Sequence, residues 1–194
     1  MELVRAFVAI ELPQEVKTLL TEIQSGLRRA GKTFVRWVSP EGVHLTLKFL
    51  GDTPADMIPK ATGALEEAAS GLAPFRLETA GLGVFPNPRQ TRVLWIGLKG
   101  ETQPLLHLQE QIETAFAPLG FLREARAFTP HLTLARLRDN ATPPERQEFG
   151  EAAMCYNAAP PRAFLVDGVS LMRSTLTPSG AIYTRLALVP LKPQ

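Results

Sequence analysis

The tetrapeptide His-Leu-Thr-Leu occurs twice in this chain of 194 residues, at positions 44–47 and 131–134. The two copies start 87 residues apart, one in each half of the sequence, within segments typical of β-strands. Because residues alternate between the two faces of a strand, His44 shares a face with Thr46, and His131 shares one with Thr133. The leucines point the other way and can anchor each strand in a core. The sequence therefore predicts two strands that each present an imidazole and a hydroxyl.

Two such strands facing each other could catalyse a displacement at phosphorus. An imidazole has an ordinary pKa of about 6.5, so near neutral pH one histidine can accept a proton while the other donates one. One would activate an attacking water and the other would protonate the departing oxygen. The hydroxyls of Thr46 and Thr133 could donate hydrogen bonds to the non-bridging phosphate oxygens. This chemistry needs no metal and no cofactor, and we predict neither.

Other interpretations of these residue types are weaker. A single histidine in an apolar strand is usually structural, but the repetition of the whole motif favours function. Two histidines could also ligate zinc, although zinc usually takes three or four ligands, and the nearby Glu41 and Asp52 lie in predicted turns. Cys155 has no local signal that would activate a thiol. The third histidine, His107, lies in a predicted helix without a matching partner, so we interpret it as structural or surface-exposed.

The elements that position the motifs follow from apolar spacing and from proline and glycine punctuation. Strands are predicted at 3–12, 34–38, 43–50, 75–84, 91–98 and 131–137, with a final antiparallel pair at 163–173 and 182–189. Helices are predicted at 14–30, from about 54 to 69, at 101–119 and at 144–153. This order predicts an α+β fold with mainly antiparallel sheets. The repeated motif indicates one domain, 1–194, made of two lobes related by a pseudo-two-fold axis around a central cleft.

Composition limits the classes of partner. With 45% hydrophobic residues the chain can form one substantial core, and a net charge of +2 excludes the basic surface of a dedicated duplex-DNA binder. A local basic groove remains open, since 15 of the 21 basic residues are arginines, which suit phosphate. Four of them lie near the second motif, and some of these could track a polyanion, or the segment could be a solvated turn: Arg123, Arg126, Arg136 and Arg138. Lys48, on the His44 face of a straight strand, could contact the backbone of such a polyanion or be solvated.

The cellular setting follows from what the sequence lacks. A single cysteine excludes an intrachain disulfide, and no run of about 18 apolar residues is present. The N-terminal segment is typical of a buried first strand and lacks the pattern of a cleaved signal. We expect a cytoplasmic monomer that does not contact membranes.

The motifs resemble those of the two-histidine (2H) phosphoesterase superfamily, which carries one His-x-Thr/Ser-x motif in each half of the chain. Within it, the sequence is most similar to the RNA 2′,3′-cyclic phosphodiesterase or 2′-5′ RNA ligase family (LigT/ThpR-like). The similar segments occur in family order and span nearly the whole chain: RAFVAIELP (5–13), WVSPEGVHLTLKFLGD (37–52), FTPHLTLAR (128–136) and SLMRSTLTPSGAIYTRL (170–186). The resemblance implies a bilobal fold with two antiparallel sheets and outer helices around a cleft.

The resemblance also implies roles for individual residues. His44 would be the proton donor to the leaving 3′ oxygen and His131 the proton acceptor, in hydrolysis of an RNA terminal 2′,3′-cyclic phosphate to a 2′-phosphomonoester. Thr46 and Thr133 would bind the phosphate, Arg136 would contact it, and Phe49 would stack on the terminal base. The last two lie five residues after their histidines, which is the opposite face of a straight strand. Both therefore need a bend, which Gly51 could provide for Phe49, whereas no glycine follows Arg136.

Two alternatives to this hydrolase remain. The same site run in reverse would join a 2′,3′-cyclic phosphate to a 5′-hydroxyl in a 2′-5′ linkage, and other relatives act on related cyclic nucleotides or oligoadenylates. The fold could also serve as a non-catalytic module that binds RNA ends, although His and Thr are intact in both motifs.

Overall fold

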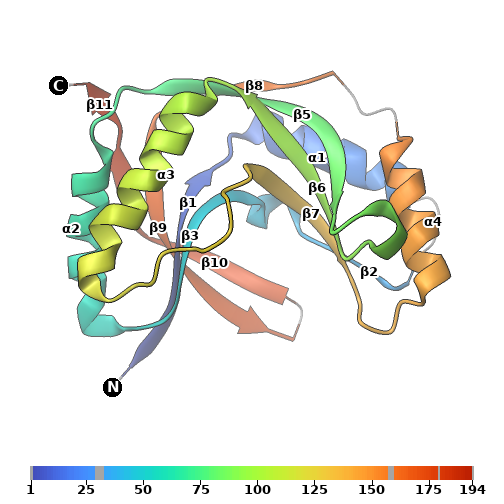
Figure 1. Cartoon of the computed structure of the whole chain (residues 1–194), viewed down its shortest axis with the longest axis horizontal. Helices are drawn as coiled ribbons and strands as arrows, with labels where there is room; N and C mark the ends of the chain where they lie inside the picture. The colour runs from blue at the N-terminus through green and yellow to red at the C-terminus, as the bar shows by residue number, and fades with distance from the viewer. Residues whose placement is uncertain (1, 29–32, 157–159, 179, 194) are drawn as a thin grey trace.

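Two antiparallel β-sheets form the centre of the computed structural model, which describes residues 2–28, 33–156, 160–178 and 180–193 (Figure 1). Sheet A has the strand order β10-β9-β1-β3, with β1 (Leu3–Glu11), β3 (His44–Pro54), β9 (Gly168–Thr177) and β10 (Gly180–Pro190). Sheet B has the order β2-β7-β6-β5-β8, with β2 (Val35–Trp37), β5 (Phe75–Phe85), β6 (Val93–Gly100), β7 (His131–Leu137) and β8 (Ala163–Val166). One motif lies at the start of β3 and the other at the start of β7. The predicted α+β class with antiparallel sheets is confirmed.

Two helices, α1 and α3, cross between the sheets. Helix α1 (Gln14–Arg28) follows β1 of sheet A but packs on sheet B, where Gln24 donates to the carbonyl of Leu134 and the Arg28 guanidinium lies over the Trp37 ring. Helix α3 (Thr102–Phe116) links β6 and β7 of sheet B, yet it packs against α2 (Ile58–Ala69) and contacts β3. Figure 1 shows α2 and α3 together at one end, with α1 and α4 (Pro143–Met154) toward the other. Helices α1 and α3 therefore each support the sheet opposite to the strand that precedes them.

The apolar spacing that predicts the helices also fills the core. Helix α1 buries Val16, Leu19, Leu20 and Ile23, and helix α3 buries Leu105, Leu108, Ile112 and Phe116. These residues recur every three or four positions, which places them on one side of each helix. They belong to one hydrophobic cluster that includes Val8 of sheet A and Leu94 of sheet B. The sheets therefore share a core.

Some predicted boundaries differ from the structure. The segment 163–173 is two strands, because the chain passes from β8 on sheet B to β9 on sheet A at the exposed Asp167, whose carbonyl accepts from the Leu191 amide. The helix expected from residue 54 begins as a short 3-10 turn, Ala55–Met57, before α2, and β3 continues through Gly51 at φ +71°. A parallel pair of two-residue strands, β4 (Ser70–Gly71) and β11 (Lys192–Pro193), was not predicted. Residue 30, the predicted end of the first helix, lies outside the described residues.

No helix within the described residues is long and apolar enough to span a membrane.

Candidate active site

Both motif strands contain a β-bulge at the same position. In the pairing of β1 with β3, Val8 lies opposite Lys48 and Ala9 opposite Thr46, so Leu47 is an extra residue. In the pairing of β6 with β7, Leu94 lies opposite Ala135 and Trp95 opposite Thr133, so Leu134 is extra. An extra residue shifts the alternation of side chains in one strand relative to its partner. Each bulge comes three residues after its histidine and changes which later residues share the histidine's face.

The bulges bring both residues at the fifth position after histidine to the histidine side. In β1, Phe7 and Glu11 share a face, and they lie opposite Phe49 and His44. Side chains directly opposite one another in an antiparallel pair lie on the same face. Phe49 is therefore on the face of sheet A that carries His44 and Thr46. We call this face, and the His131 face of sheet B, the motif faces.

Arg136 reaches the motif face of sheet B in the same way. It lies opposite Val93, and Thr133 lies opposite Trp95, two residues along β6. Val93 and Trp95 share a face of β6, so Arg136 and Thr133 also share one. The bend expected after each histidine is thus a bulge in both strands, and Arg136 needs no glycine.

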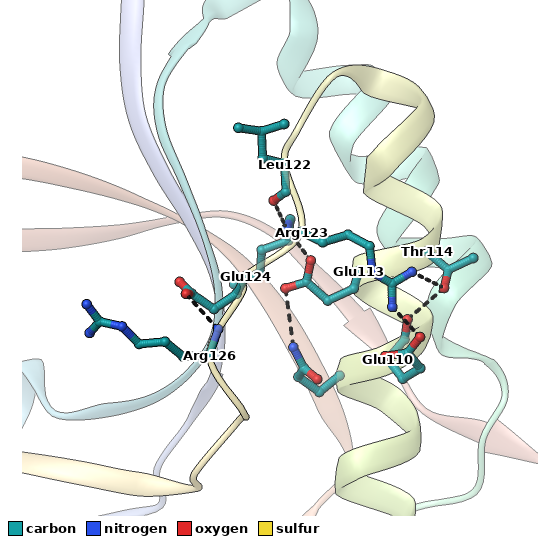
Figure 2. Close-up of polar contacts among 9 residues, drawn as sticks. Glu110, Glu113, Thr114, Leu122, Arg123, Glu124 and Arg126 are labelled. Carbon is teal, nitrogen blue, oxygen red and sulfur yellow. Dashed lines mark hydrogen bonds and ion pairs between the residues drawn. The ribbon is translucent and has the colours of Figure 1, made fainter.

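The same bulge overturns the interpretation of Lys48 as a solvated or RNA-contacting residue. Lys48 is only 5% exposed and lies opposite Val8, on the buried side of the sheet. Its Nζ donates to Oε2 of Glu113 at 2.5 Å and to the Leu122 carbonyl at 2.8 Å. Figure 2 shows that carboxylate on α3 beside the chain segment that leads toward β7. Lys48 therefore joins β3 to α3 and is withdrawn from the motif face.

Each catalytic candidate is oriented by the backbone two residues before it. Nδ1 of His44 lies 2.8 Å from the Gly42 carbonyl, and Nδ1 of His131 lies 2.6 Å from the Thr129 carbonyl. A carbonyl only accepts, so this network assigns a proton to Nδ1 in both rings. The Nε2 atoms have no partner among the described residues and are left for chemistry.

Aromatic rings and a charge network surround His44. Phe7 stacks on the imidazole at a centroid distance of 4.6 Å, and Tyr183 approaches edge-on at 4.8 Å. Burial lowers the pKa of His44, while the hydrogen bond to Gly42 and the charge of Glu11 oppose this shift. Arg185 donates to both carboxylate oxygens of Glu11, at 2.7 and 2.9 Å, and this contact lowers the pKa of Glu11 and keeps it ionised.

His131 has its own aromatic neighbours. Phe85 lies edge-on at 5.2 Å and Trp95 at 6.1 Å. The Trp95 ring covers Gly83, where an added Cβ would lie 2.2 Å from the ring, so only glycine permits this approach. Sequence reasoning did not identify these residues. The segments RAFVAIELP and SLMRSTLTPSGAIYTRL contain the His44 neighbours, but nothing in the spacing indicates that they meet.

The remaining site residues lie on the two motif faces. Thr46 and Thr133 are half-buried, Arg136 is exposed, and Phe49 is 72% exposed, with its ring 6.3 Å from Phe7. Cα atoms of β3 and β7 approach within 8 Å of each other. The structure thus groups His44, Thr46 and Phe49 on one sheet, and His131, Thr133 and Arg136 on the adjoining sheet.

The arginine cluster seen in sequence is divided in space. Arg123 forms an ion pair with Glu110 and donates to Thr114, both on α3, whereas the Arg126 amide donates to Glu124 (Figure 2). Arg136, by contrast, lies on the motif face of sheet B. Arg123 is therefore held against α3, apart from Arg136 on the motif face.

Candidate metal ligands are not gathered at the motifs. Glu41 accepts from Lys17 at 3.0 Å, and Asp52 lies opposite Arg5 in the sheet. Within the described ranges, no group of three or more His, Cys, Asp or Glu residues is arranged to hold a metal ion. His107 and Cys155 are exposed, and both lie outside the motif faces.

Comparison with known proteins extends the similarity from the motifs to most of the chain. Residues 12–177 match the sequence profile described as the 2'-5' RNA ligase superfamily. The chain belongs to the 2′-5′ RNA ligase superfamily. A superfamily member from Methanothermobacter thermautotrophicus, named RNA 2′,3′-cyclic phosphodiesterase, is 35% identical over 93% of this chain and 95% of its own.

Solved structures of other proteins have the same fold as this chain. A crystal structure from Thermus thermophilus has a TM-score of 0.79 at 30% identity and covers 98% of this chain and 99% of its own. E. coli LigT complexed with 3′-AMP has a TM-score of 0.71 at 26% identity, covering 98% and 99%. The 2H phosphoesterase resemblance and the α+β fold implied by it are confirmed.

Proposed function

We propose that this chain hydrolyses the terminal 2′,3′-cyclic phosphate of RNA to a 2′-phosphomonoester. The observation that carries the proposal is the paired arrangement of the histidines. In each, Nδ1 is bound to a backbone carbonyl and Nε2 has no partner in the described part of the chain. The curated relatives from Methanothermobacter thermautotrophicus and Aquifex aeolicus, at 35% and 31% identity, are both named RNA 2′,3′-cyclic phosphodiesterase. The proposed substrate partner is thus an RNA end or a related cyclic nucleotide.

In the proposed reaction, Nε2 of His131 accepts a proton from water as the water oxygen bonds to phosphorus. The bond from phosphorus to the 3′ oxygen breaks, and Nε2 of His44 donates the proton that this oxygen needs. The products are a 2′-phosphomonoester and a free 3′-hydroxyl. Thr46 and Thr133 donate to the non-bridging oxygens, where negative charge must be stabilised. The guanidinium of Arg136 can donate two parallel hydrogen bonds to the same phosphate.

The base of the terminal nucleotide is assigned to Phe49. Its ring is 72% exposed on the motif face, close to the Phe7–His44 stack. An aromatic ring exposed at this place can stack on a base, and such stacking stabilises RNA contacts by about 1–3 kcal/mol. E. coli LigT complexed with 3′-AMP supports nucleotide binding to this fold.

The proposal includes four further properties. Catalysis proceeds without a metal, the protein acts as a monomer in the cytoplasm, and it does not bind membranes.

Ligation of a 2′,3′-cyclic phosphate to a 5′-hydroxyl is the second candidate function, favoured by the superfamily's name and by the reversibility of the two proton transfers.

The deciding experiment is turnover of an oligonucleotide that ends in a 2′,3′-cyclic phosphate, in EDTA, with the product identified by mass and phosphatase sensitivity. His44→Ala and His131→Ala should each reduce kcat by roughly 10²–10⁴-fold, the usual contribution of a general acid or base. His107→Ala is the matched control, because His107 is exposed on α3, and it should keep full activity. Full activity of either motif variant would refute the acid/base roles, and a 3′-phosphate product would reverse the leaving group. A loss of activity in EDTA would refute metal independence.

A further inference from the structure

An arginine that is not one of the four near the second motif lies beside the proposed phosphate site. Arg36 is in β2, the edge strand of sheet B, directly opposite Arg136 in β7. Directly opposed side chains share a face, so Arg36 lies on the motif face next to Arg136. Its neighbour Val35 lies opposite Leu137, and both are buried, which confirms that the alternate positions of β2 face the core.

This pair of like charges has no anionic partner among the residues that the structure describes. Both arginines are exposed, and among the described residues no carboxylate lies within 4.0 Å of either guanidinium. Arg123 and Arg185, in contrast, are each paired with a glutamate. Like charges directly opposite one another destabilise a sheet, so folding does not explain the pair. An anion bound between or beside the two guanidinium groups would account for the pair.

The position of Arg36 indicates which anion this is. His131, Thr133 and Arg136 follow one another along β7, and they surround the reacting phosphate in the proposed function. Arg36 lies one strand further out, and neighbouring strands are about 4.8 Å apart. The next negative charge in an RNA chain is the diester that joins the terminal nucleotide to the one before it. A guanidinium presents two parallel donors that match such a group.

We propose that Arg36 binds this internucleotide phosphate and so makes the enzyme prefer polynucleotide ends to mononucleotides. The inference rests on the proposed function, because the reacting phosphate fixes where the preceding diester lies. It gives Arg36 a binding role and leaves the proton transfers to His44 and His131.

The test uses two dinucleotides that both end in a 2′,3′-cyclic phosphate. One has the natural diester between its nucleosides, and the other has a neutral methylphosphonate there. Wild-type protein should show a higher kcat/KM on the charged substrate. Arg36→Ala should lower kcat/KM on the charged dinucleotide by about ten- to a hundredfold, the loss expected for a charge-assisted hydrogen bond. On the neutral dinucleotide, kcat/KM of the variant should stay close to that of the wild type. The substrate preference should therefore collapse in the variant.

Arg162→Ala is the matched control, since Arg162 precedes β8 at the other edge of sheet B and is also exposed. It should keep the wild-type preference. Equal losses of Arg36→Ala on both substrates would overturn the proposal, because Arg36 would then act on the reacting phosphate or on folding. Turnover of both substrates by the wild type without preference would overturn this inference alone. Turnover of neither would overturn the proposed function itself.

Discussion

At the scale of single residues, His44 is subject to opposing influences. Burial, with Phe7 and Tyr183 packed against the ring, lowers its pKa and favours the neutral imidazole in the free protein. A proton donor must be cationic, and the nearby charge of Glu11 raises the pKa. A bound phosphate adds negative charge beside the ring and would raise the pKa further. The proposed donor therefore gains its proton most readily when substrate is present.

This balance can be measured by NMR titration of the imidazole. In the free protein, the pKa of His44 should lie below the ordinary value of about 6.5. Glu11→Gln removes a negative charge that favours the imidazolium, so it should shift the pKa further down. The matched control is Glu15→Gln, an exposed carboxylate at the start of α1, which should leave the titration unchanged. An upward shift in Glu11→Gln would contradict the described electrostatics.

At the scale of elements, buried polar contacts made by helices α1 and α3 support both bulges. Gln24 of α1 donates to the carbonyls of Val38 and Leu134, at 2.7 and 3.0 Å, and so holds the β7 bulge. Lys48, next to the β3 bulge, is held by Glu113 of α3. Thus the helix that precedes each motif supports the strand of the other one. Such contacts satisfy backbone groups and charges that would be costly to bury alone.

The Lys48–Glu113 pair offers a test of this support. Its side chains are 2% and 4% exposed, so Lys48→Met leaves a buried carboxylate without its cation and should lower the free energy of unfolding by about 3–5 kcal/mol. Lys48→Met combined with Glu113→Leu removes both charges and should recover much of that loss, as measured by urea unfolding. The exposed pair Lys99–Glu78 is the control, and Lys99→Met should cost at most about 1 kcal/mol. Equal losses in the single and double Lys48 variants would show that the pair is not coupled.

At the scale of the whole molecule, each of the two large sheets combines strands from both halves of the sequence. Sheet A combines β1 and β3 from the first half with β9 and β10 from the second. Sheet B combines β2, β5 and β6 with β7 and β8. The strand that carries His44 thus belongs to a sheet completed near the C-terminus. A single fragment cannot bury the apolar faces that its partner covers.

Fragments divided at the turn between β6 and α3, 1–100 and 101–194, should therefore be unfolded when separate. Circular dichroism should show no cooperative unfolding transition for either fragment, while their mixture should regain one. Activity on the cyclic phosphate should appear only in the mixture, because each fragment holds one motif. Cooperative unfolding or activity of either fragment alone would contradict the interleaved architecture.

Features that depend on local periodicity could be predicted from the amino-acid sequence. Alternation along a strand places His44 with Thr46 and His131 with Thr133, and a three-to-four spacing fixes the buried side of α1 and α3. These patterns repeat within a few residues, so they can be recognised without knowing what the elements contact. The antiparallel α+β fold and the paired histidines follow from them.

Features that depend on partners distant in the chain could be seen only in the tertiary structure. Leu47 and Leu134 are left as extra residues where β3 pairs with β1 and β7 pairs with β6. This register moves Phe49 and Arg136 to the motif faces and buries Lys48. Arg36 meets Arg136 across 100 residues for the same reason. A shift of one residue reverses the face of every side chain beyond it, and no local pattern records which residue is unpaired.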